Sequence, residues 1–221
     1  MEETKPLSIT SLITIPALIT LGVTILRLVG ELQHWPKPWF NTAAGGGGAV
    51  IGISWLPIIF GPYFALKLAG AGDRPSSAGK AIGLAFAGLG VLVVGVVIVG
   101  VVMAMHHPSL VVVGYLVTLL SAFIPGIGWR SLGKCLVAYA FAARIPVLIV
   151  MFLAIRGNWH THYDAAPPDF QFPSLGTRFL YTGILPQLGF WIGWTVVVGA
   201  IVGTIAIAIS RRGKQAAPAA V

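Results

Sequence analysis

The sequence predicts an all-α polytopic transmembrane helix bundle of about six spans with a kinked second helix. Hydrophobic residues make up 57% of its 221 positions and charged residues only 9%, and its mean hydropathy is +0.90. A soluble domain needs about a quarter of its residues charged to cover its surface, so lipid must be the solvent of this chain. Several apolar segments also reach or approach the roughly 20 residues that a bilayer-spanning helix requires.

These segments divide a single integral membrane domain, residues 1–215, into spans at about 7–29, 49–68, 80–105, 109–124, 134–155 and 187–210. The residues ahead of the first span lack a clearly positive stretch, so we expect that span to be retained and not removed as a signal peptide. The second span contains Pro57, Gly61 and Pro62. Because proline removes a backbone donor and clashes one turn back, we expect a kink there.

The third span is almost entirely Gly, Ala, Val, Leu and Ile, which leaves no polar face for water. The fourth would reach only about 24 Å, so we expect it either to continue past Pro125 or to be re-entrant. The sixth contains the pairs Gly189 with Gly193 and Gly199 with Gly203, each four residues apart. This spacing permits close approach of helices in lipid.

The connections between the spans are divided unequally in charge. With six spans, residues 31–48 and 156–186 are outer connections and 211–221 form a cytoplasmic tail, which we expect to be disordered. Nine Lys and Arg residues fall on the side of the termini and four on the other side. The positive-inside rule therefore predicts a multi-pass protein of the cell (inner) membrane with both termini in the cytoplasm.

Composition also disfavours several classes of function. Cys135 is the only cysteine, which excludes an intramolecular disulfide and an all-thiolate metal site. The net charge of +8 is scattered between the spans in ones, twos and threes, so nucleic acid is not an expected partner. No Asp or Glu lies deep within a predicted span, which disfavours a carrier coupled to protons or sodium.

The five histidines of the chain all fall on the predicted outer side. Imidazole and carboxylate groups are the usual ligands of zinc, copper and iron, and His160 and His162 share one face of an extended segment. A site for a transition metal such as zinc would use His160, His162 and Asp164 first, followed by His106 and His107. The alternative is a set of interfacial histidines without metal, because the sequence contains no specific metal motif.

A second group of residues suggests an anion site. A guanidinium near mid-bilayer, as predicted for Arg144, costs about 2.5 to 3.5 kcal/mol and needs a partner, either a structural group or the head of a lipid or other anionic ligand. Gly45 and Gly46 begin a glycine run whose amides would hold a phosphate or carboxylate at a helix N-terminus; the alternative is a flexible lead-in. Arg27 is a further candidate for contact with a lipid anion, and its spacing from Glu31 also predicts a structural ion pair.

Three functions follow from these features. The leading hypothesis is a non-catalytic integral membrane protein, either a subunit of a membrane complex or a binder of an amphipathic or anionic ligand at its outer face. The first alternative is a metal-dependent membrane enzyme with a His/Asp site on the outer side. The second is a small uncoupled transporter or channel. In each case the expected partners are the lipid bilayer and other membrane helices, from a second copy or a partner subunit.

Overall fold

The computed structural model describes residues 8–105, 107–167 and 171–215, and within them the chain is all-helical. Five helical segments are long and apolar enough to cross a membrane: Ile9–Leu32, Ala78–Ala104, Val111–Gly128, Arg130–Gly157 and Leu175–Ser210. A sixth apolar helix, Leu56–Gly70, is shorter. The predicted fold class, a multi-pass membrane bundle of about six spans, is confirmed.

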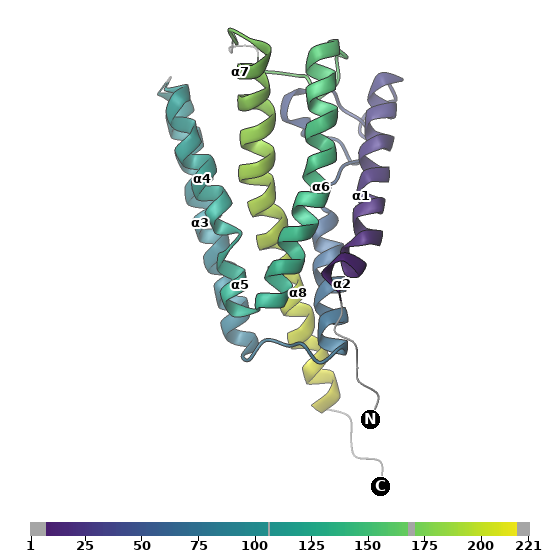
Figure 1. Cartoon of the computed structure of the whole chain (residues 1–221), viewed down its shortest axis with the longest axis vertical. Coiled ribbons are helices and arrows are strands. Elements are labelled where there is room, and N and C mark those ends of the chain that lie inside the picture. Colours follow the sequence, from purple (N-terminus) through teal and green to yellow (C-terminus); the bar gives the residue numbers. More distant parts are fainter. Residues whose placement is uncertain (1–7, 106, 168–170, 216–221) are drawn as a thin grey trace.

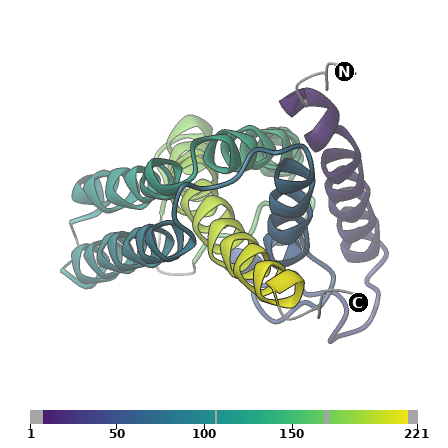
Figure 2. The same ribbon diagram turned by 90° about the horizontal axis from the view of Figure 1, so that it is seen from below.

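The elements in chain order are α1 (Ile9–Leu32), η1 (Ala44–Gly46), α2 (Leu56–Gly70), α3 (Ala78–Ala104), η2 (Pro108–Leu110), α4 (Val111–Ser121), α5 (Ile124–Gly128), α6 (Arg130–Gly157), α7 (Leu175–Phe179), η3 (Leu180–Phe190) and α8 (Trp191–Gln215). The long helices run along one axis, and α1 begins at the same end of the bundle at which α8 finishes (Figure 1). Seen from below, α8 lies between α2 on one side and α3 on the other (Figure 2).

The second span begins later than the predicted 49–68. Its helix, α2, begins only at Leu56, so Pro57 lies in the first turn, whereas Pro62 lies within the helix as expected. Proline is well tolerated in a first turn because the missing N–H would have no helical partner in any case. Residues 49–55 contain no helix in the structure. Such irregular backbone is stable inside a membrane protein only where protein or a cavity covers it.

The boundaries of the fourth and sixth spans also shift. The fourth crosses as α4 followed by α5, so it continues past Pro125, which again lies in the first turn of a helix. The sixth begins at Leu175, so residues 175–186, predicted as outer connection, are helical. Pro186 is accommodated because η3 is a π-helix, whose wider turn absorbs the lost hydrogen bond. At the other end α8 continues to Gln215, into the predicted tail.

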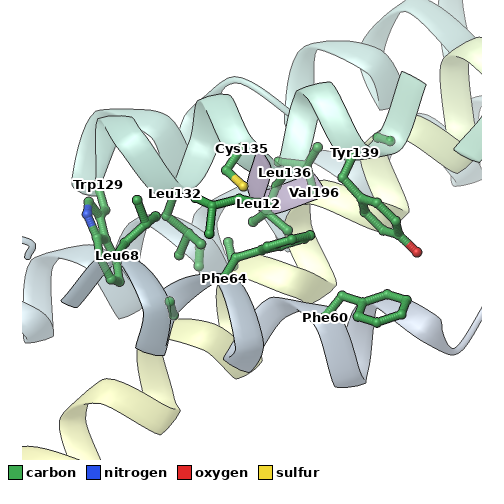
Figure 3. Packing of buried hydrophobic residues seen from close by; sticks show 14 of the residues in the cluster. Leu12, Phe60, Phe64, Leu68, Trp129, Leu132, Cys135, Leu136, Tyr139 and Val196 are labelled. Atoms are coloured by element: carbon green, nitrogen blue, oxygen red, sulfur yellow. The ribbon is translucent and has the colours of Figure 1, made fainter. Parts of the chain in front are cut away.

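The packed core lies where α2, α6 and α8 meet. Phe60, Phe64 and Tyr139 form its aromatic centre, with ring centroids of Tyr139 at 5.4 Å from Phe60 and 5.5 Å from Phe64 (Figure 3). The Tyr139 hydroxyl is hydrogen-bonded to Thr20 of α1 at 2.8 Å. This core lies in the half of the bundle that contains α2, near the two ends of the chain (Figure 1).

Candidate functional site

A cavity of about 710 Å³ lies within the bundle. One part of its wall is aliphatic and comes from α3, α4 and α6, through Val99, Met103, Val111, Val147 and Met151. The remainder includes residues of α1, the 44–54 segment, residues 162–167 and 171–173 of the connection after α6, α7, η3 and the start of α8. The volume lies within the range of small-molecule sites, which are mostly apolar with a few well-placed polar groups.

Arg144 of α6 lies in the wall of this cavity and is only 3% exposed. Its Nη1 donates to Gln187 Oε1 at 3.3 Å, and its guanidinium lies 4.7 Å from the centroid of the Trp191 ring. Its Nε and Nη2 groups have no hydrogen-bond partner among the described residues. These two groups form one edge of the guanidinium, the kind of paired donor that binds a carboxylate or phosphate through two parallel hydrogen bonds.

Gln187 and Trp191 were not identified from the sequence. The signal was present, because Gln187 is an uncharged polar residue in an apolar segment and Trp191 follows it by four residues on the same helix face. What could not be foreseen was that this face would meet Arg144 of α6, 43 residues earlier in the chain.

A second polar group lies where α1 ends. Arg27 and Glu31 form the ion pair expected from their spacing, with Nε and Oε1 2.8 Å apart. His162, from the connection after α6, joins them: its Nδ1 lies 2.6 and 2.7 Å from the two oxygens of Glu31. The backbone N–H of His162 also donates to Glu31 Oε2 at 2.8 Å. The Glu31 carboxylate is fully buried, and these contacts satisfy both of its oxygens.

The glycine run borders the same cavity. The Arg27 Nη2 group donates to the Gly46 carbonyl at 2.8 Å, and Gly46 has a φ of +68°, which favours glycine. A Cβ at this position would lie 2.7 Å from His162 Cδ2 and 2.9 Å from Arg27 Nη2. Gly45 and Gly46 therefore belong to a tight turn against Arg27 and His162. The prediction that their amides lie at the N-terminus of the second-span helix is wrong, because α2 starts ten residues after Gly46.

The predicted metal ligands separate. The Asp164 carboxylate accepts hydrogen bonds from the backbone N–H groups of His160 and Thr161 and from the Thr161 hydroxyl, so it organises its own turn. The His160 ring is exposed and hydrogen-bonds to Asn158. His162 instead pairs with Glu31, as above.

The two remaining candidate ligands, His106 and His107, follow the end of α3 in the sequence. His107 is exposed after the end of α3, and His106 lies outside the described residues. Across residues 8–105, 107–167 and 171–215, no group of three or more His, Cys, Asp or Glu side chains could hold a metal ion. His162 is separated from this set by its tertiary contact with Glu31, whereas the contacts of His160 and Asp164 are local.

Burial lowers the pKa of His162 below its usual value, and the nearby Arg27 charge acts in the same direction, against the opposing effect of the Glu31 hydrogen bond. Arg27 already balances the single negative charge of Glu31, so a second cation is not required. The imidazole is therefore neutral at pH 7. Because the ionised carboxylate can only accept, His162 carries its proton on Nδ1 and leaves a lone pair on Nε2.

The chain was compared with protein families, curated proteins and solved structures, and none of them matches it. The function must therefore be argued from the cavity itself. Of the predicted anion contacts, the structure brings Arg27, Gly45, Gly46 and Arg144 to one cavity and adds His162.

Proposed function

We propose that this protein binds a single-chain amphipathic anion, with its carboxylate or phosphate at Arg144 and its hydrocarbon chain against the aliphatic wall. The observation that carries the proposal is the guanidinium of Arg144, buried in the cavity wall with two N–H groups unpartnered. Buried charges in proteins are paired, because an unpaired one costs several kcal/mol. No carboxylate pairs with Arg144 among the described residues.

The surroundings of Arg144 favour a ligand over a purely structural role. Its two fixed contacts, to Gln187 and Trp191, hold the guanidinium in place without neutralising its charge. The aliphatic residues of α3, α4 and α6 share the cavity with it, so charge and apolar surface are presented to the same molecule. A fatty acid or a lysophospholipid has this combination of groups.

This role is the non-catalytic one predicted from the sequence, in a multi-pass protein that we place in the cell (inner) membrane with cytoplasmic termini. The chemistry of the site favours it over a metal-dependent enzyme, because His160, His162 and Asp164 are committed to separate contacts. A passive carrier would need the same binding site, and transport would be a later step.

Binding can be measured by quenching of tryptophan fluorescence with dibrominated stearate in an uncharged detergent. We expect saturable quenching that is reduced in Trp191→Phe, because Trp191 lies against Arg144. Arg144→Gln should weaken binding about tenfold or more, as expected for loss of a hydrogen-bonded charge.

Arg156→Gln is the matched control, since Arg156 is an exposed residue of the same helix outside the cavity. Equal affinity in wild type and Arg144→Gln, or equal loss in the two variants, would contradict a specific site. So would binding of uncharged octadecanol as tightly as stearate.

A further inference from the structure

The lone pair on His162 Nε2 accepts no hydrogen bond from the part of the chain that the structure describes, whereas Nδ1 is held by Glu31 at 2.6 and 2.7 Å. A carboxylate that fixes the far nitrogen of an imidazole determines which nitrogen is left to accept. His162 is thus oriented as an acceptor by a fully buried glutamate.

The position of the ring places this acceptor at the cavity. His162 lines the cavity, and its side chain keeps 15% of its surface exposed. The edge carrying Cδ2 and Nε2 lies beside Gly46, where even a methyl group would occupy the space next to it, 2.7 Å from Cδ2 and 3.3 Å from Nε2. This edge therefore packs closely against Gly46, and a larger residue at position 46 would displace the ring.

The charged neighbours of His162 are committed to contacts within the protein. Arg27 is paired with Glu31 and with the carbonyl of Gly46. The carboxylate of Asp164 accepts hydrogen bonds from the backbone N–H groups of His160 and Thr161. The neighbouring Tyr163 is buried, with its hydroxyl donating to the Thr24 carbonyl.

We propose that His162 Nε2 accepts a hydrogen bond from the ligand, so that the bound amphiphile carries a hydroxyl or ammonium donor in addition to the anionic group held by Arg144. This inference rests on the proposed function and narrows its ligand class. The site is then a two-point one, in which Arg144 recognises the charge and His162 recognises a donor. A simple fatty acid satisfies only the first point.

Two phosphate amphiphiles with the same chain length test this difference. Oleoyl lysophosphatidic acid has a free hydroxyl near its phosphate, and oleyl phosphate has none. At pH 8, where the imidazole is neutral, we expect the hydroxylated ligand to bind about tenfold more tightly to the wild-type protein, the value of one good hydrogen bond. His162→Phe should abolish this preference, and the exposed His160→Phe should retain it.

The outcomes separate the two proposals. If both amphiphiles bind with equal affinity and both depend on Arg144, the role of His162 is wrong and the anion site stands. If neither binds, the anion site itself fails. Equal preference in wild type and His162→Phe would also overturn the role of His162.

A second measurement does not depend on a folded variant. Diethyl pyrocarbonate modifies an imidazole nitrogen that has an accessible lone pair, and peptide mass spectrometry locates the product. We expect His162 of the wild-type protein to react, and lysophosphatidic acid to slow this reaction more than oleyl phosphate does. Failure of His162 to react, or equal protection by the two ligands, would contradict the proposal.

Discussion

At the level of single residues, two buried charged side chains of this protein are held in different ways. A guanidinium near the middle of a membrane costs about 2.5 to 3.5 kcal/mol even on insertion scales, and Arg144 is buried without a carboxylate partner among the described residues. Glu31, by contrast, is buried with two cationic or donor partners. Arg27 is therefore held in a structural ion pair, and Arg144 is the residue that we propose as the anion contact.

The lowered pKa of His162 predicts a dependence of stability on pH. The unfolded chain takes up a proton at the usual imidazole pKa of about 6.5, before the folded protein does. The unfolded state then binds more protons, so the free energy of unfolding falls as the pH decreases from about 7.5 toward 5.5. We expect a lower apparent Tm at pH 5.5 than at pH 7.5 in detergent.

Variants assign this effect to the imidazole. His162→Gln should reduce the difference in Tm between the two pH values, and His160→Gln should leave it unchanged. The other charged groups around His162 are the guanidinium of Arg27 and the carboxylates of Glu31 and Asp164. A wild-type Tm that rises on acidification would have the opposite sign and would contradict the assignment.

At the scale of elements, glycines determine which helices approach one another. The two glycine pairs of the last span contact different neighbours. A Cβ at Gly193 would lie 2.3 Å from the Thr118 carbonyl oxygen of α4, and one at Gly203 would lie 2.8 Å from the Gly61 carbonyl oxygen of α2. The spacing predicted close approach for both pairs, but the partner helix is a property of the packing.

Gly61→Ala tests the contact between α2 and α8. The added methyl group would lie 2.3 Å from the Gly199 carbonyl oxygen, and because the obstacle is backbone the helices must separate. We expect a loss of about 1 to 3 kcal/mol, typical of overpacking, measured by reversible unfolding in mixed micelles. Gly90→Ala is the control, since an added Cβ there meets nothing within 4 Å and improves helix propensity. Equal effects of the two substitutions would argue against this contact.

The short helix α2 and the π-helix η3 together shape the cavity. Pro57 lies in the first turn of α2, and Pro186 lies within η3. Hydropathy identified both segments as apolar, yet it could not show that residues 49–55 would be non-helical or that residues 175–186 would be helical. Prolines indicate where a helix is disturbed, and the surrounding packing decides whether it starts, bends or widens there.

At the level of the whole molecule, the alternating direction of the spans places successive connections at opposite ends of the bundle. In Figure 1 the connection between α6 and α7 lies at the end opposite to the start of α1. The connection between α2 and α3 lies at the other end, near the end of α8. The unequal distribution of Lys and Arg predicts that this second end faces the cytoplasm.

Single cysteines test this orientation in a Cys135→Ala background. Ser76 and His160 are exposed residues of the two opposite ends. We expect an impermeant maleimide to label His160→Cys in intact cells and Ser76→Cys only after the membrane is permeabilised. His107→Cys should behave like His160→Cys, because α3 runs from one end to the other. Labelling of residues 107 and 160 from different compartments would exclude the proposed arrangement.

The sequence by itself determined the membrane class, the all-helical bundle, the approximate number of spans and the Arg27–Glu31 spacing. These properties depend on hydropathy and on contacts within one helix, which local sequence encodes directly. Only the tertiary structure decided that His162 pairs with Glu31, 131 residues earlier, and that Arg144 meets Gln187 and Trp191 in the wall of an apolar cavity. Helices in lipid associate through close packing of one helix face against another. The two faces come from segments far apart in the chain, so no short stretch of sequence contains both of them.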